Sequence, residues 1–194
     1  MPGSRIFLQE FRNDSQLSLL YDLAARVPPL LQAFDSISER SENALLDRLS
    51  ILQQELENWI TSASMLERRK GNSPVDEPRT TRAALWILTR ASLCHICLLL
   101  VSECIDALLD QKSKATHPAF AAETRAVQLK CNIKSLALAA EVPISIARAV
   151  NAPLYFLTRY YSRIGDTAGL EWCAKFKGNI LKSAPWLRWD VLLP

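Results

Sequence analysis

Apolar residues recur along this chain at intervals of three and four, the spacing at which side chains share one face of an α-helix. The pattern is clearest between residues 41 and 70, where an apolar seam repeats over three heptads and the other positions are mostly polar. We therefore predict a long amphipathic helix from about residue 41 to residue 70. Its seam consists of Leu45, Leu49, Leu52, Leu56, Trp59, Ala63 and Leu66.

A second long helix is predicted from about residue 80 to residue 109, after a loop rich in Gly, Asn, Ser and Pro. Its middle, Leu93 to Val101, is apolar nearly all round, which is typical of a helix at the centre of a core. We expect the two long helices to pack as an antiparallel hairpin over residues 41–110. The alternative use of the first seam is a homodimer through the 45–66 helix.

The helix that begins near Pro118 is expected to run to about residue 141 and to turn its apolar residues inward. Pro143 is expected to interrupt it, and a short helix, 144–150, to follow. The inward residues are Phe120, Val127, Leu129, Ile133, Leu136 and Leu138.

Two further helices are predicted up to about residue 183. The first opens at Pro153 and ends at Gly165, because glycine readily adopts the left-handed conformation that often follows the last turn of a helix. Either Asp166 or Thr167 is then expected to cap the final helix. Inward positions of the first of these helices are Leu154, Leu157, Tyr161 and Ile164.

The expected fold is an all-α bundle of six to seven helices, including short ones at about 15–26 and 30–37. We predict a single helical domain over 1–194, made of the hairpin 41–110 and the C-terminal helices 117–183. Composition agrees, since 31 Leu and 23 Ala against 7 Val favour helix over strand. With only 5 Gly, the chain contains no glycine-rich phosphate-binding loop.

Three cysteines in the second long helix, Cys94, Cys97 and Cys104, have the spacing of half a binuclear zinc cluster. Such a cluster needs six thiolates, and only Cys131 and Cys173 remain elsewhere in the chain. We therefore predict buried, reduced cysteines, no metal site and an intracellular protein.

Catalytic groups are sparse, because the only histidines are His95 and His117 and neither has an evident nucleophilic partner. We predict that the chain is not an enzyme and needs no cofactor. Arg90, Glu103 and Asp106 interrupt the most apolar stretch, so we also expect a soluble protein without a membrane segment.

Charge is unevenly distributed along the chain. Residues 1–110 contain 11 Lys and Arg against 15 Asp and Glu, whereas residues 111–194 contain 12 against 5. The basic part includes Arg159 and Arg163, one helical turn apart on the outer face of a Tyr-rich helix. The charge asymmetry has three alternative explanations: nucleic-acid binding, docking of the two halves on each other, or ordinary solvated faces. For the Tyr-rich helix itself, core packing is favoured over binding of a single-stranded nucleic acid.

The same segment resembles the end of the regulatory region of fungal zinc-cluster (Zn2Cys6) transcription factors. In those proteins an apolar and aromatic helix leads through an Arg-aromatic pair to a Gly-Asp turn, and a helix with a Glu-Trp step follows. The resemblance extends over about 80–194, and more weakly back to residue 40. It rests on Pro153-Leu154-Tyr155-Phe156-Leu157, Arg159-Tyr160-Tyr161, Ile164-Gly165-Asp166 and Gly169-Leu170-Glu171-Trp172-Cys173.

The resemblance implies a non-catalytic regulatory domain that works in the nucleus, in transcription regulation, by binding other proteins or a small-molecule effector. The six-cysteine DNA-binding cluster of that family has no counterpart here, so direct sequence-specific DNA binding by this chain is not expected. The alternative is a helical interaction or assembly module unrelated to transcription. Candidate interaction or pocket residues are Trp59, Trp86, Arg159, Arg163 and Trp172.

Overall fold

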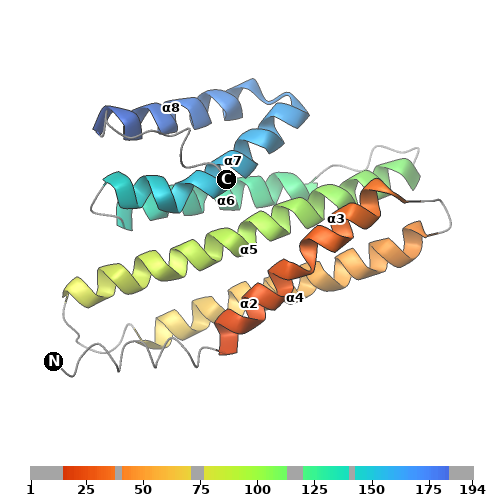
Figure 1. The fold of residues 1–194 in the computed structure, drawn as a ribbon, viewed down its shortest axis with the longest axis horizontal. Coiled ribbons are helices and arrows are strands. Elements are labelled where there is room, and N and C mark those ends of the chain that lie inside the picture. The colour runs from red at the N-terminus through yellow and green to blue at the C-terminus, as the bar shows by residue number, and fades with distance from the viewer. Residues whose placement is uncertain (1–14, 38–40, 71–76, 113–119, 140–142, 184–194) are drawn as a thin grey trace. The chain divides into compact units, whose positions relative to one another are not determined.

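The computed structural model describes residues 15–37, 41–70, 77–112, 120–139 and 143–183, and these residues form α-helices without a strand. The predicted all-α, multi-helix fold of six to seven helices is confirmed (Figure 1). The helices are α2 (Ser15–Ala25), α3 (Val27–Asp35), α4 (Glu42–Lys70), α5 (Glu77–Lys112), α6 (Phe120–Ala139), α7 (Pro143–Ile164) and α8 (Thr167–Ser183).

Contacts between the helices divide the chain into two compact units, Met1–Asn72 and Ser73–Pro194. The long helices α4 and α5 occupy the predicted places in the sequence but belong to different units. Their packing as an antiparallel hairpin, and the single domain over 1–194, therefore stay predictions.

In the first unit, α2 and α3 both contact α4. The predicted seam of α4 is buried from Leu45 to Trp59, so its heptad spacing did identify the inward face. Helix α3 begins at Val27, earlier than expected, with prolines in its first turn. Proline fits there because the first backbone N–H groups of a helix have no partner within the helix.

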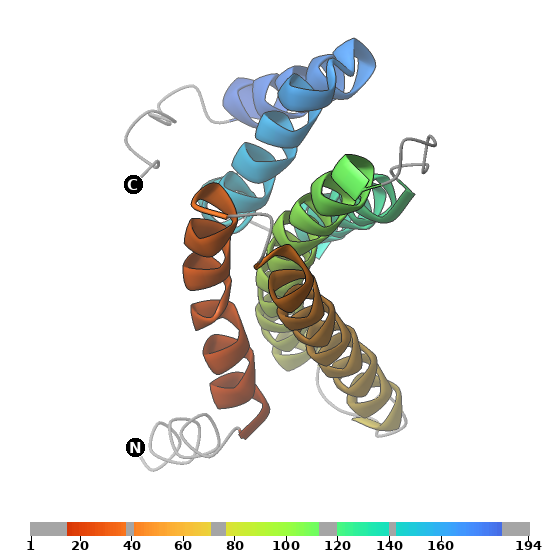
Figure 2. The ribbon, with the colours of Figure 1, turned by 90° about the vertical axis from the view of Figure 1, so that its right-hand side faces the viewer.

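In the second unit, α5 is the central helix and contacts α6 and α7, while α7 contacts α6 and α8. Helices α5 and α6 lie side by side in both views (Figure 1 and Figure 2). The stretch Ile87–Asp110 of α5 is long and apolar enough to cross a membrane. Its most apolar 18-residue window has a mean hydropathy of 1.9, but 67% of that window is buried in the structure. That burial is what we expected of a core helix. Leucine and isoleucine dominate the fully buried positions: Leu98, Leu99, Leu108, Leu129, Ile133, Leu136 and Leu157.

Helix α7 differs from the prediction, because it runs without a break from Pro143 to Ile164 and contains Pro153 in its interior. An interior proline removes one backbone hydrogen bond and crowds the preceding turn, at a cost of about 3 kcal/mol. Burial of Val150, Leu154 and Leu157 around it offsets that cost.

Three residues predicted to face inward are exposed instead. Val127 and Leu138 on α6 are 53% and 88% exposed, and Ile164 at the end of α7 is 50% exposed. The α6 prediction was wrong because the inward arc of the helix is narrower than the spread of its apolar residues. Leu129, Ile133 and Leu136 fill that arc, and Val127 and Leu138 lie on the opposite side.

Candidate functional site

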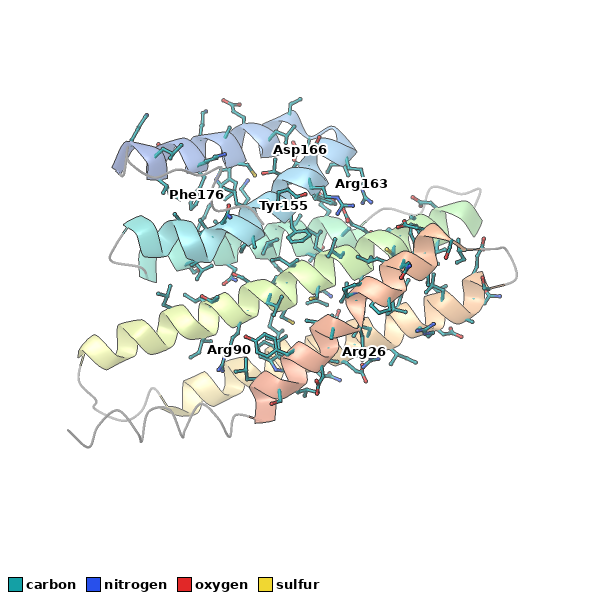
Figure 3. The ribbon with its side chains drawn as sticks, viewed as in Figure 1. Arg26, Arg90, Tyr155, Arg163, Asp166 and Phe176 are labelled. Carbon is teal, nitrogen blue, oxygen red and sulfur yellow. The ribbon has the colours of Figure 1, made fainter. Side chains whose placement is uncertain are left out.

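The segment that carries the family resemblance forms the corner where α7 turns into α8. Gly165 has a φ of 72°, the left-handed conformation predicted for it. The Asp166 N–H donates to the Tyr161 carbonyl oxygen over 3.0 Å, which closes the last turn of α7. The Asp166 carboxylate then accepts from the Gly169 N–H over 2.9 Å, so Asp166 is the cap of α8. Arg163 and Asp166 mark this corner in Figure 3.

Gly169 is required at the corner by a close approach to Tyr161. A Cβ atom at position 169 would lie 2.5 Å from Cγ of the Tyr161 ring. The ring therefore packs on the bare backbone of α8, and Tyr161 is buried. Burial raises the pKa of the Tyr161 hydroxyl to about 12, so this side chain stays neutral. The contact between Tyr161 and Gly169 is consequently a packing contact that holds α8 against α7.

Arg163 connects α7 to α5 through a mostly buried acidic group. Its Nη2 atom lies 2.7 Å from Oε1 of Glu103, whose side chain is only 10% exposed. Burial raises the pKa of the Glu103 carboxyl, while the positive charges of Arg163 and Arg159 lower it. The two arginines predicted as an outer row thus act on the same carboxylate.

Asp106, one turn after Glu103 on α5, stabilises the start of α6. Its carboxylate accepts from the Ala122 N–H over 3.1 Å, and an acceptor at this position satisfies a backbone donor that has no partner within the helix. Burial raises the pKa of Asp106, and the hydrogen bond from Ala122 lowers it. Together, Glu103 and Asp106 hold α6 and α7 against the central helix, which favours a structural role for both.

Trp172 on α8 contacts two lysines of α6. Its ring stacks on Phe176, with centroids 5.2 Å apart and planes inclined by 28°. The Lys130 ammonium lies 4.7 Å from the centre of the Trp172 ring, and the Lys134 ammonium 6.0 Å. Such cation–π contacts stabilise by about 0.5–1 kcal/mol at exposed sites. The result is a surface where two positive charges adjoin aromatic side chains.

Trp59 lies in the first unit, beside a cavity of about 400 Å³ between α2 and α4. An ion pair between Arg26 and Glu55 borders the same cavity. Arg26 also borders a second cavity of about 310 Å³, at the start of α3. The first volume is in the range of sites for small ligands, and its lining combines apolar and charged groups. Its lining residues are Leu19, Asp22, Leu23, Arg26, Glu55, Asn58, Trp59 and Ser62.

The three cysteines of α5 are core residues, and His95 on the same helix is partly buried. Cys94, Cys97 and Cys104 are buried free thiols, and burial raises the pKa of Cys97 to about 11. Burial, together with the charge of Arg125, lowers the pKa of His95 to about 4, so its ring is neutral at physiological pH. Within the described part of the chain, no three His, Cys, Asp or Glu side chains are close enough to hold a metal ion.

The predicted residues do not converge on one site. Arg163 pairs with Glu103, Trp172 adjoins the α6 lysines, and Trp59 belongs to the other unit. Trp86 lies on α5, and its side chain is outside the described part.

Sequence reasoning did not single out Lys130, Lys134 or Arg26 as site residues. The one available signal was the spacing of Lys130 and Lys134, one helical turn apart on α6. Their proximity to Trp172 depends on how α8 packs, which no local pattern specifies.

No protein-family model, curated protein or solved structure matches this chain. The resemblance to the regulatory region of fungal zinc-cluster transcription factors therefore rests on the sequence alone, most distinctively on residues 153–173.

Proposed function

We propose that this chain is a non-catalytic helical regulatory domain of the zinc-cluster transcription factor type, acting in the nucleus by binding other proteins. The observation that carries the proposal is the α7–α8 corner. Gly165, Asp166 and Gly169 each meet a separate physical requirement there: a positive φ, a helix cap and a close approach to Tyr161.

These requirements give the resemblance a physical basis. The same pattern in another chain would be expected to build the same turn. The corner supports a common fold for this segment, and the regulatory role follows from the resemblance.

Exposed apolar side chains support binding to another protein. Leu138 on α6 and Tyr155 and Ile164 on α7 are all at least half exposed. Isolated exposed apolar residues are ordinary, but a protein-binding domain needs such side chains outside its own core.

A small-molecule effector is the second candidate, and the cavity beside Trp59 favours it. Its volume of about 400 Å³ suits a small ligand, and the Arg26–Glu55 ion pair offers polar anchors. Quenching or shift of Trp59 fluorescence by a metabolite library, absent in Trp59→Phe, is the test for this function. A library that leaves the fluorescence of both proteins unchanged contradicts it.

A tethered reporter assay tests the transcriptional role. The chain is fused to an unrelated DNA-binding domain, expressed in a fungal host, and the reporter output is compared with that of the DNA-binding domain alone. We expect the output to change severalfold in either direction, and to return to baseline in Gly169→Leu, which disrupts the corner. Immunoblotting confirms equal amounts of the fusions, so that loss of protein is not taken for loss of regulation.

Unchanged output at equal expression contradicts the transcriptional proposal and favours the alternative, an assembly module. Light scattering coupled to size-exclusion chromatography then decides that alternative, because a module of this kind forms a defined oligomer. The homodimer through the 45–66 helix stays a prediction; the seam from Leu45 to Trp59 is already buried in the chain itself.

A further inference from the structure

Helix α6 presents a continuous stripe on its outer face. Val127, Cys131, Lys134 and Leu138 are spaced by four, three and four residues, so they lie above one another on one side of the helix. All four are exposed, and Leu138 is 88% exposed. We call these four residues the α6 stripe. Its two ends are apolar and its middle is basic.

Lys130 adds a second charge at the edge of the α6 stripe. Both lysines lie over Trp172, within 6.0 Å of its ring centre, so two ammonium groups are held near each other on one side of the unit. Like charges one helical turn apart destabilise a helix slightly. No described carboxylate forms an ion pair with Lys130 or Lys134, whereas Lys175 on α8 pairs with Glu171 over 2.7 Å. The lysine pair therefore has charge that an external anion can balance.

We propose that the α6 stripe, with Lys130 and Trp172, is a docking surface for an acidic amphipathic helix of a partner protein. Leucine or phenylalanine side chains of that helix contact Val127 and Leu138, and its carboxylates lie against Lys130 and Lys134. The charge is complementary on a larger scale too, since residues 111–194 carry 12 Lys and Arg against 5 Asp and Glu. This inference rests on the proposed protein-binding function and names its surface and partner.

A helix is favoured as the occupant because the α6 stripe is itself helical and extends over three turns. A nucleic acid is a poorer fit. Trp172 already stacks on Phe176 and is covered by Lys130, so its ring is not a free platform for a base. Nucleic-acid affinity grows with the number of phosphates that Lys and Arg neutralise, and Lys130 and Lys134 offer only two such contacts. The exposed side chains of Val127 and Leu138 are apolar and offer none.

Cys131 provides a direct test of whether the surface is open. It is the exposed cysteine, and Cys94, Cys97, Cys104 and Cys173 are buried. Brief treatment of the native full chain with iodoacetamide, followed by peptide mass spectrometry, is expected to modify Cys131 far faster than the others. Slow modification at every protein concentration means that the rest of the chain covers the α6 stripe. Slowing only at high concentration means that a second copy covers it. Either result overturns the proposal.

Binding is measured by fluorescence anisotropy with a labelled helical peptide that carries Leu at every third and fourth position and Glu elsewhere. We expect saturable binding that weakens with salt and that protects Cys131 from iodoacetamide. The same peptide with Gln in place of Glu is expected to bind at least about fivefold more weakly, because it lacks the charges that meet the lysines. A single-stranded oligonucleotide is the competing probe, and tighter binding of the oligonucleotide overturns the proposal.

Two double variants separate the surface from general charge. Lys130→Gln/Lys134→Gln is expected to weaken peptide binding about fivefold to tenfold. Lys175→Gln/Lys182→Gln removes the same charge from α8, from two exposed side chains, and is expected to leave binding unchanged. Leu138→Ser tests the apolar end and is expected to weaken binding of both the Glu and the Gln peptide. Equal effects of the two double variants, or no saturable binding up to about 1 mM, refute the docking surface.

The reporter assay distinguishes this failure from failure of the proposed function. If Lys130→Gln/Lys134→Gln leaves the reporter output of the tethered chain unchanged while Gly169→Leu abolishes it, the regulatory function stands and the α6 stripe is not its docking surface. If the tethered chain has no effect at all, the proposed function itself fails.

Discussion

Gly169→Ala is expected to destabilise the protein, although the same change usually stabilises a helix. Alanine in place of glycine in a helix interior gains about 1 kcal/mol. The added Cβ, however, would lie 2.5 Å from Cγ and 2.6 Å from Cδ1 and Cδ2 of Tyr161. Ordinary contacts between carbon atoms are about 3.5–4.0 Å, so the ring or the helix must shift by about 1 Å.

The position of the clash makes it costly. Cγ is the first ring atom of Tyr161, so it cannot swing aside unless the whole buried side chain moves. Overpacking of this kind costs about 1–3 kcal/mol. After a helical gain of up to about 1 kcal/mol is subtracted, we expect Gly169→Ala to lower the free energy of unfolding by up to about 2 kcal/mol.

Gly178→Ala in the same helix is the matched control, because a Cβ at that position would meet nothing within 4 Å. We expect this variant to raise the free energy of unfolding by up to about 1 kcal/mol. Urea denaturation followed by circular dichroism at the helical band measures the free energy of unfolding of both variants. Both substitutions lie in the unit Ser73–Pro194, so the unfolding transition of that unit is the one compared.

A double-mutant cycle completes the test. In a Tyr161→Ala background the ring is gone, so Gly169→Ala should become neutral or stabilising. The reasoning is refuted if Gly169→Ala matches Gly178→Ala in the wild-type background, or if the loss persists without Tyr161.

Three further predictions concern the charged groups of the second unit. Asp166→Ala should lower the free energy of unfolding by about 1 kcal/mol, because it removes the cap of α8. Asp166→Asn keeps a hydrogen-bond acceptor, so urea titrations should show most of the wild-type stability for that variant. Arg163→Met should cost about 1–2 kcal/mol at pH 7 and less as the solution becomes acidic, because protonation removes the Glu103 charge that has lost its partner. Equal losses at neutral and acidic pH in urea titrations would contradict this. His95 has a pKa lowered to about 4, so the unfolded chain binds its proton first as the pH falls from 6.5. Stability should then decrease by at most about 3 kcal/mol toward pH 4, and His95→Leu should flatten that decrease in denaturation midpoints measured across this range.

Local patterns predicted the helices well because helix formation depends mainly on neighbouring residues. The heptad seam of α4 marks its buried face from Leu45 to Trp59, and Gly165 and Asp166 take the backbone turn and the cap expected of them. The buried face, the turn and the cap each depend on residues that are at most one or two helical turns apart in the sequence. The error at Pro153 has the opposite origin, since packing of α7 against other helices buries Val150, Leu154 and Leu157 and overrides a local helix-breaking preference.

The candidate surfaces depend on contacts between residues that are far apart in the sequence. Arg163 pairs with Glu103 only because α7 packs on α5, and Lys130 and Lys134 lie over Trp172 only because α8 folds back from the α7 corner. Exposure of Leu138 likewise depends on which arc of α6 meets the core.

The amino-acid sequence by itself determined the helical class, most helix positions and the turn at Gly165, because periodicity and backbone preference act locally. Only the tertiary structure decided which arc of α6 is buried, which carboxylate meets Arg163, and that two lysines adjoin Trp172. The physical reason is that side-chain burial and charge pairing depend on how helices distant in sequence pack together, and several packings are compatible with the same helical pattern.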